Sequence, residues 1–174
     1  MAHSSVAYQP DDDDEDEVVA IPAGQAYTPR LLPVPSAWWD TPAVVSCRLQ
    51  PAPEEARAAR QFARGLLADW GLGHLTDDAE MIVAELVVNA VRHGLRNAPV
   101  ATPSPLLRLC LLHRAGEVML AVTDPSSEPP QSRNPGWTGE SGRGLQIVGA
   151  LSYLWGWSPI EGRGKAVWAV LRYR

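Results

Sequence analysis

The sequence has little cysteine and no long apolar run. Its 174 residues include only Cys47 and Cys110, too few for a disulfide scaffold or a zinc-binding cage. Each lies in an apolar run typical of a strand, so we expect two buried thiols. No apolar run reaches the roughly 18 residues that a membrane-spanning helix needs. The N-terminus also lacks the charged-then-apolar pattern of a signal peptide. These absences predict a soluble, cytoplasmic protein that does not act at a membrane.

Basic residues are fewer than acidic ones, and lysine is almost absent from the chain. Fourteen of the 15 basic residues are Arg, and Lys165 is the single Lys. The net charge of −5 comes from one acidic run at residues 11–17, in a segment without Lys or Arg. The rest of the chain carries 13 acidic and 15 basic residues, a charge of +2. Because the folded part is nearly neutral, we expect no broad basic surface and no direct contact with nucleic acid.

The chain divides into a tail and a domain. Residues 1–42 contain six of the 16 prolines and the acidic run, which predicts a disordered acidic and Pro-rich extension. Within it, the pair Trp38-Trp39 either contacts the domain or binds a partner. The acidic run is interpreted as a solvating tail, or alternatively as an arm that contacts a partner. Residues 43–174 have the alternation of apolar and polar residues typical of one folded domain.

The pattern within the domain predicts the order β-α-α-β-β-loop-α-β-β. It favours an α+β fold: a two-layer α/β sandwich with a mixed, mainly antiparallel sheet and helices on one face. Thr76 is predicted to be the N-cap of the second helix. The expected strands are 43–49, 106–112, 118–123, 154–157 and 166–173, and the expected helices are 54–70, 76–96 and 144–151, with a turn at 113–116 and a long loop at 124–142.

The second predicted helix carries polar residues on an otherwise apolar surface. Glu85, Asn89 and His93 follow one another at four-residue spacing, which places them along one face. A buried carboxylate and amide are costly without partners. Glu85 and Asn89 either bond each other or serve a ligand: their oxygens suit Mg²⁺, and a shielded Glu can act as a general base.

Two further features lie later in the chain. Asp124 ends an apolar strand, where it either reads an amino group such as that of adenine or begins a turn before Pro125. After the long loop, Gly142-Arg143-Gly144 opens a helix, where glycines and free N–H groups favour a phosphate. A long loop inside a compact domain is typical of a lid over a ligand.

Together these segments resemble a known family. Residues 85–93 read E-L-V-V-N-A-V-R-H and are similar to the N box of the GHKL (histidine kinase-like) ATP-binding superfamily, which includes gyrase and histidine kinases. Residues 122–126 (V-T-D-P-S) lie where that superfamily has its first glycine box. Residues 142–148 (G-R-G-L-Q-I-V) resemble its second box, and residues 164–171 (G-K-A-V-W-A-V-L) its closing strand. In finer detail the domain is similar to the stand-alone anti-sigma-factor serine/threonine kinases of actinobacteria.

The resemblance implies a Bergerat-type ATP-binding fold, with ATP and Mg²⁺ as cofactors. By its place in the N box, Asn89 is implied as the Mg²⁺ ligand. Glu85 matches the acidic residue that activates the attacking hydroxyl. Asp124 matches the Asp that accepts a hydrogen bond from the adenine amino group.

The remaining implied site residues surround the phosphates. Gly142, Arg143 and Gly144 match the end of the lid that contacts them. His93 matches a position beside the phosphates, or alternatively a helix-end His that interacts with the helix dipole. Lys165 lies beside the implied pocket, or alternatively is a solvated strand residue.

The sequence departs from the family pattern at two places. The first glycine box usually reads D-x-G-x-G, but here both glycines are replaced, in Asp124-Pro125-Ser126-Ser127-Glu128. In the closing strand Ala166 replaces a Thr that relatives often have. No membrane-spanning, sensor or phospho-accepting His segment is found, which argues against a complete histidine kinase.

Two functions follow from the resemblance. The first is an anti-sigma-factor serine/threonine kinase that phosphorylates an antagonist protein with Mg-ATP, binds a sigma factor and regulates transcription by partner switching; dimerisation is implied by analogy. The second is a nucleotide-binding partner-switch module without kinase activity. The missing glycines favour the module, whereas the presence of Glu85 and Asn89 favours the kinase. A stand-alone ATP hydrolase is disfavoured because no transducer domain follows.

Overall fold

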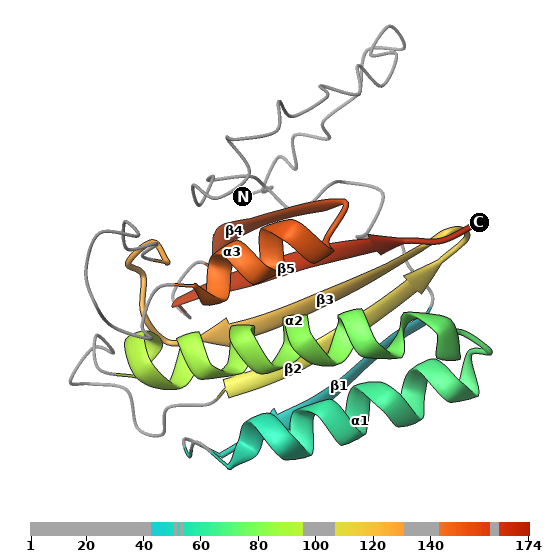
Figure 1. The fold of residues 1–174 in the computed structure, drawn as a ribbon. Helices are drawn as coiled ribbons and strands as arrows, with labels where there is room; N and C mark the ends of the chain where they lie inside the picture. The colour runs from blue at the N-terminus through green and yellow to red at the C-terminus, as the bar shows by residue number, and fades with distance from the viewer. Residues whose placement is uncertain (1–42, 51, 53, 96–106, 131–142, 161–163) are drawn as a thin grey trace, which may run out of the picture.

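The computed structural model describes residues 43–50, 52, 54–95, 107–130, 143–160 and 164–174. The helices and strands follow one another in the order that the sequence pattern predicts, with two short additional turns beside the second helix (Figure 1). The elements are β1 (Ala43–Leu49), α1 (Glu55–Asp69), the 3₁₀ turn η2 (Gly73–Leu75), α2 (Thr76–Asn89), the π turn η3 (Ala90–Gly94), β2 (Leu107–Arg114), β3 (Glu117–Asp124), α3 (Gly144–Leu151), β4 (Leu154–Ile160) and β5 (Gly164–Arg172).

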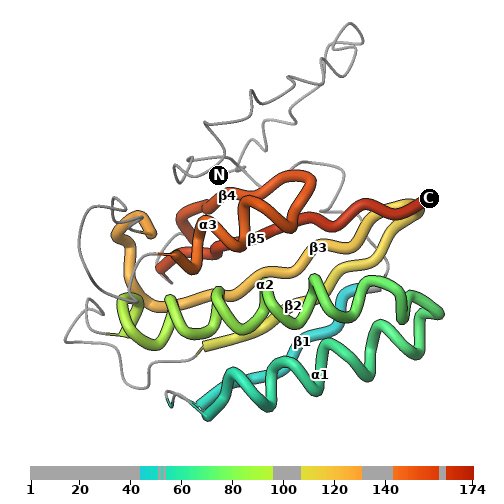
Figure 2. The backbone as a smooth tube through the Cα atoms, viewed as in Figure 1, coloured from blue at the N-terminus to red at the C-terminus, as the bar shows by residue number. Residues whose placement is uncertain are grey.

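The strands form one open sheet in the order β1-β2-β3-β5-β4. The predicted α+β class is confirmed. Every pair of described neighbouring strands is antiparallel, so the sheet is not mixed as predicted. The β2–β3 hairpin turns at Ala115 and Gly116, and Gly116 has a φ of 78°, which glycine adopts without steric cost. Figure 2 shows the consequence: this hairpin and the C-terminus lie at one end of the sheet, while α2 and β3 end together at the other.

The three helices pack on one face of the sheet, which we call the inner face (Figure 1). In α1, Ala59, Ala63 and Leu67 are buried at four-residue spacing, as predicted for a helix with one apolar stripe. In α2, Ile82 and Leu86 are fully buried, and each contributes about 1.5–3 kcal/mol relative to an exposed side chain. This packing fixes α2 across the middle of the sheet and so determines where its polar residues lie.

The start of α2 differs from the prediction. Thr76 is the first residue of the helix rather than its N-cap, and no side chain caps this end. Leu75, which takes the N-cap position, is buried and already has a helical backbone because the chain enters α2 through η2. The chain therefore reaches the helix through a 3₁₀ turn, and no extended capping residue is needed.

Several boundaries also move. Within the described residues α2 ends at Asn89 and continues as the π turn η3, instead of running as one helix toward residue 96. His113 and Arg114, predicted to form a turn, belong to β2, because Arg114 pairs across the hairpin with Glu117. The strand predicted at 154–157 extends to Ile160.

The cysteines are half-buried free thiols rather than fully buried ones. Cys47 lies on edge strand β1 and Cys110 on its neighbour β2, where burial is incomplete. No helix among the residues described is long and apolar enough to cross a membrane. The acidic run, the pair Trp38-Trp39 and Gly142 lie outside the described residues.

Candidate functional site

The C-terminal end of α2 forms one wall of the site. Asn89 is the last residue of the helix, and the chain continues into η3, where the Leu95 N–H donates to the Ala90 carbonyl at 3.1 Å. π turns inside helices are frequent at functional sites because they redirect the side chains that follow. Here η3 keeps Asn89 and His93 on the same side, where both line a pocket.

The opposite wall comes from the ends of β3 and β5. Asp124 and Lys165 face each other directly across these strands, and the Lys165 Nζ donates to the Asp124 Oδ1 at 2.8 Å. Their side chains are only 2% and 4% exposed. Removing either partner would leave the other charged group buried without its counterion, which costs roughly 3–5 kcal/mol in proteins. The alternative that Lys165 is a solvated strand residue is therefore wrong.

Burial dominates the electrostatics of Asp124. It raises the pKa of the carboxyl above its ordinary value, while the Lys165 ammonium and the Ser126 N–H oppose that rise by stabilising the charged form. The Ser126 N–H donates to Oδ1 at 3.0 Å, so Asp124 also begins a turn. Hydrogen bonds within the described part of the chain reach Asp124 only at Oδ1. The second carboxylate oxygen is thus the one left for a ligand.

The segment after Asp124 forms an ordered turn without the glycines of the family pattern. Lys165 Nζ donates to the Ser126 carbonyl at 3.3 Å, and the Glu128 N–H donates to the Ser126 Oγ at 3.1 Å. Ser126 and Glu128 occupy the two positions where the pattern has glycine. The polar side chain of Ser126 therefore stabilises a bend that a glycine-rich loop would reach through backbone freedom.

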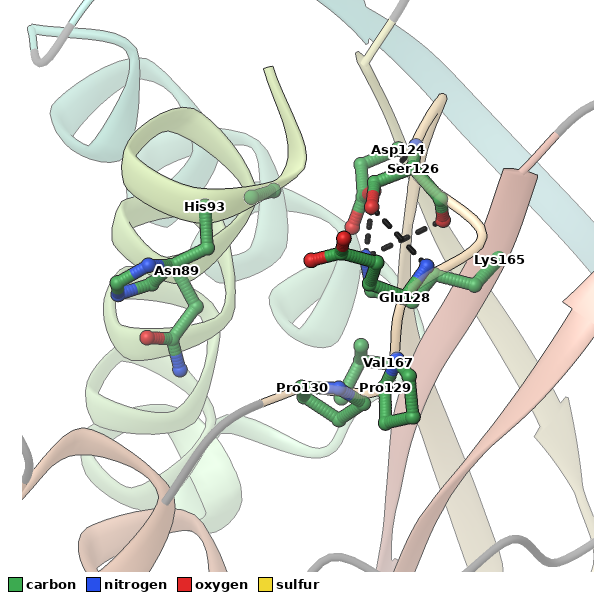
Figure 3. Close-up of a pocket in the computed structure, with 10 residues that line it drawn as sticks. Asn89, His93, Asp124, Ser126, Glu128, Pro129, Pro130, Lys165 and Val167 are labelled. Atoms are coloured by element: carbon green, nitrogen blue, oxygen red, sulfur yellow. Dashed lines mark hydrogen bonds and ion pairs between the residues drawn. The ribbon is translucent and has the colours of Figure 1, made fainter. Parts of the chain in front are cut away.

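Between the two walls lies a pocket of about 380 Å³, including its open mouth. Figure 3 shows Asn89 and His93 on the helical wall and Asp124, Lys165 and Val167 on the sheet wall. The lining residues are Asn89, Ala90, His93, Asp124, Ser126, Glu128, Pro129, Pro130, Lys165 and Val167. Four residues that the sequence pattern singled out are thus brought together from three separate segments.

The N-terminus of α3 lies beside the pocket, against α2. A Cβ on Gly144 would overlap the Glu85 carboxylate and lie 3.7 Å from the Asn89 Nδ2. Glycine therefore leaves room for the Glu85 carboxylate to lie directly against the start of α3. The first described helical bond of this end runs from Ile147 N–H to the carbonyl of Arg143, so the preceding N–H groups have no partner within the helix. Such groups attract anions.

Asn89 has an unsatisfied polar atom. Its Nδ2 is buried, and no described residue accepts a hydrogen bond from it. The two ends of an amide are assigned from their hydrogen bonds, so either the oxygen or the nitrogen can face the site. A buried, unsatisfied amide beside a helix N-terminus fits a ligand that supplies the missing partner.

A divalent cation fits this arrangement when phosphates and water supply most of its ligands. The described residues contain no group of three or more His, Cys, Asp or Glu side chains that could hold a metal ion. Mg²⁺ does not require such a group, because it keeps several waters and is commonly held by one or two protein oxygens together with substrate phosphates. The Asn89 amide oxygen is suited to be that protein ligand.

The structure groups most of the predicted site residues but not all of them. Glu85 contacts Gly144 rather than the pocket, and Arg143 is exposed at the N-cap of α3. Gly94 was not predicted as a site residue, yet a Cβ there would overlap the Asp124 side chain, so η3 packs directly on that carboxylate. Its only signal in the sequence was a glycine one residue after His93. Glu128, Pro129 and Pro130, which also line the pocket, lie in the loop predicted to be a lid, but none of them was predicted individually as a site residue.

Comparison with known proteins identifies the family of this domain. A family model described as histidine kinase-like ATPase domain matches residues 49–171. No individual curated protein matches the chain. The match spans most of the chain and every element from the end of β1 to β5, including α2, the end of β3 and α3. The predicted resemblance to the histidine kinase-like ATP-binding superfamily is thereby confirmed, and such a domain implies ATP binding. The chain belongs to the histidine kinase-like ATPase domain family.

Proposed function

We propose that this protein is an ATP-dependent serine/threonine kinase of the anti-sigma-factor class. It would phosphorylate an antagonist protein and regulate transcription by exchanging that protein for a sigma factor. The observation that carries the proposal is that Glu85 and Asn89 lie against the N-terminus of α3, and that Asn89 also lines the pocket that contains Asp124. In phosphoryl transfer the protein mainly positions groups and stabilises charge, and a carboxylate, an amide and the N–H groups of a helix start can do both.

In this proposal each residue has a separate task. The N-terminal N–H groups of α3 bind phosphate oxygens, and Asp124 accepts a hydrogen bond from the base through its second oxygen. The Glu85 carboxylate accepts the proton of the substrate hydroxyl. The hydroxyl oxygen forms a bond to the γ-phosphorus while the bond from the γ-phosphorus to the β-phosphate oxygen breaks, and ADP leaves. The Asn89 amide oxygen would hold Mg²⁺. Bound Mg²⁺ would neutralise the charge that develops on the phosphates.

A second candidate is a nucleotide-binding module that switches partners without phosphorylating them. The buried ion pair between Lys165 and Asp124 favours it, because the adenine-reading carboxylate already has an internal cationic partner. The replacement of both box glycines by Ser126 and Glu128 points the same way. Both candidates share the nucleotide pocket and differ in whether the phosphoryl group moves.

Transfer of a labelled phosphoryl group separates the two. The full chain is incubated with Mg²⁺, ATP labelled at the γ-phosphate and the antagonist-type proteins encoded near it. We expect label on a serine or threonine of one of them. Glu85→Gln should reduce the rate by about 10²–10⁴-fold, the usual contribution of a general base.

Glu80→Gln is the matched control. Glu80 lies on the same helix, but its carboxylate pairs at the surface with Arg64, so its loss should leave transfer unchanged. ATP binding without any label transfer would favour the module. Equal transfer by wild type and Glu85→Gln would refute the role of Glu85 as base.

A further inference from the structure

The face of the sheet opposite the helices, which we call the outer face, carries a buried apolar cluster. This outer cluster consists of Met119, Ala121, Trp168 and Val170 on β3 and β5. Trp168 is 0% exposed and Val170 2% exposed. The partly buried apolar residues that pack on the cluster all lie on neighbouring strands, and α1, α2 and α3 pack on the inner face. None of the described elements therefore explains why these side chains are inaccessible to water.

The strand register shows where the missing cover lies. One row across the outer face consists of Val44, Leu112, Met119, Val170 and Leu154. Exposure along this row falls from 53% at Val44 on β1 to 1% at Met119 on β3. A bare sheet face would leave a large side chain on a central strand in contact with water. The cover therefore lies over β3 and β5 and leaves β1 open.

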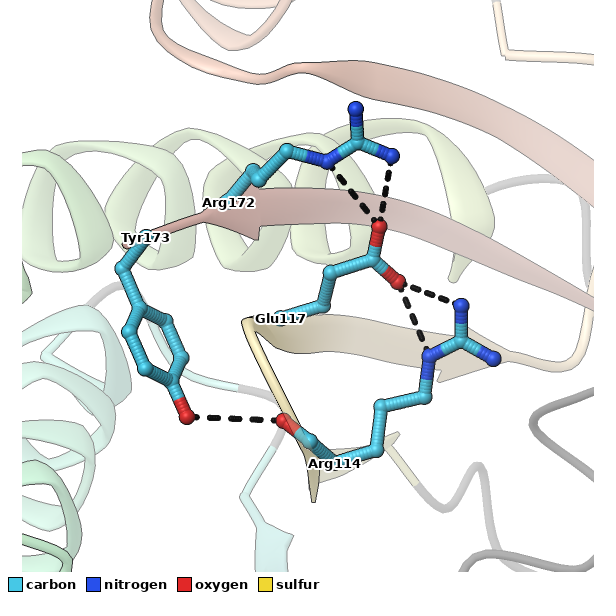
Figure 4. A network of polar contacts seen from close by, with 4 residues as sticks. All are labelled: Arg114, Glu117, Arg172 and Tyr173. Carbon is cyan, nitrogen blue, oxygen red and sulfur yellow. Dashed lines mark hydrogen bonds and ion pairs between the residues drawn. The ribbon is translucent and has the colours of Figure 1, made fainter.

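A charged rim borders the cluster at the hairpin end. Glu117 accepts hydrogen bonds from Arg114 on one side and Arg172 on the other (Figure 4). The Arg172 guanidinium also lies 3.4 Å from the centroid of the Tyr153 ring. An apolar centre with a polar rim is the usual anatomy of a surface that binds another segment. Strand residues of the outer face carry four arginines, Arg48, Arg108, Arg114 and Arg172, against one carboxylate, Glu117.

We propose that residues 31–39 of this same chain cover the outer cluster. This segment holds the only two tryptophans of the N-terminal tail, Trp38 and Trp39, together with Leu31, Leu32 and Val34. It joins the sheet at Ala43, next to Val44 and so at the start of the apolar row. The undescribed segments 96–106, 131–142 and 161–163 leave and rejoin the described chain at the opposite end of the sheet, around Asp124.

Chain length allows this path. Neighbouring strands are about 4.8 Å apart, so Met119 and Val170 lie about 10 and 14 Å across the sheet from Val44. Trp39 precedes Ala43 by four residues, which span about 13 Å when extended. Trp38 and Trp39 can therefore reach β3 and β5, where the exposure is lowest. Further along the tail, the acidic run at 11–17 is opposite in charge to the arginines of the outer face.

Cys110 and Cys47 allow a direct test with an internal control. Cys110 packs on the outer cluster, whereas Cys47 packs on the helix side. The test compares two full-length chains that both carry Cys47→Ser, one of them with Trp38→Ala and Trp39→Ala in addition. We expect the two tryptophan changes to increase the rate at which a maleimide labels Cys110 by at least about tenfold, because they remove the contact that protects the thiol. The same tryptophan changes in the Cys110→Ser chain should leave Cys47 labelling within about twofold. Trp137→Ala, in a different undescribed segment, should change neither rate.

Disulfide cross-linking is a second measurement, and it tests the contact between the tail and the outer cluster without removing both tryptophans. In the Cys47→Ser chain, Trp39→Cys followed by oxidation with copper phenanthroline should give a disulfide to Cys110 within one monomer, and Trp137→Cys should not. An unchanged ratio of Cys110 to Cys47 labelling together with no intramolecular disulfide would overturn the proposal. The proposal would also be overturned if the disulfides formed between two chains and the protection of Cys110 were lost on dilution. That result would identify a second copy of the chain as the cover.

Discussion

Lys165, the only lysine of the chain, has its ammonium group buried 2.8 Å from the carboxylate oxygen of Asp124. A nucleotide base that enters this pocket therefore meets a fixed ion pair, not a free carboxylate. The pair joins the ends of β3 and β5, and η3 packs on it through Gly94. It thus connects the stability of the sheet to the geometry of the candidate base-binding site.

The first prediction concerns this pair. Lys165→Met should lower the free energy of unfolding by roughly 3–5 kcal/mol, because it leaves the Asp124 carboxylate buried without a counterion. Asp124→Asn alone should also destabilise the protein, and the double variant should recover part of the loss. Urea denaturation followed by circular dichroism measures all three values. Strictly additive losses would show that the two groups are not coupled.

The second prediction concerns the contact between α2 and α3. Gly144→Ala should push the Glu85 carboxylate away from the start of α3, because the new methyl group would overlap it. We expect weaker ATP binding and at least about tenfold slower phosphoryl transfer, since small misplacements of reacting groups are costly. Gly65→Ala is the matched control, because a Cβ there meets no atom within 4 Å and α1 should become more stable by about 0.5–1 kcal/mol. If both variants bind ATP like wild type, Gly144 does not position the site.

The third prediction uses the pH dependence of Cys110. Burial raises the pKa of this thiol above its ordinary value of 9.0. Because the thiolate is the reactive form, iodoacetamide labelling of the Cys47→Ser chain should still be rising steeply above pH 9, where a free thiol begins to level off. By linkage, the stability associated with the protonated thiol is present at neutral pH and lost as the pH rises through the raised pKa. A rate that levels off below pH 9 would contradict this expectation.

Much of the fold was predictable because local patterns determine it. The alternation in β1, the apolar stripe of α1 and the glycine at the β2–β3 turn each indicate their element directly. Asp124 could be assigned to a strand end, whereas the four-residue spacing put Glu85, Asn89 and His93 on one helix and the structure places His93 on the π turn η3. These predictions needed no information about distant parts of the chain.

The features that could not be predicted depend on tertiary contacts. The burial of Lys165 follows from its register opposite Asp124, a residue 41 positions earlier in the chain. The π turn η3 redirects the end of α2, and no residue type announces it. Ser126 replaces a family glycine, but its hydrogen bonds show that the turn is kept by side-chain chemistry instead. From the sequence alone, only the absence of a glycine at position 126 could be recognised.

Isothermal titration of ATP into the full chain, with Mg²⁺ and with EDTA, tests most directly whether the Asn89 site binds Mg-ATP. We predict binding that is stronger with Mg²⁺ in wild type, and an Asn89→Ala variant that still binds ATP but gains nothing from Mg²⁺. Glu80→Gln should behave like wild type, because Glu80 lies on the same helix but pairs with Arg64 at the surface. ATP binding with an equal Mg²⁺ effect in wild type and Asn89→Ala would contradict the metal assignment. No ATP binding by wild type would contradict the proposed kinase and the nucleotide-binding module alike.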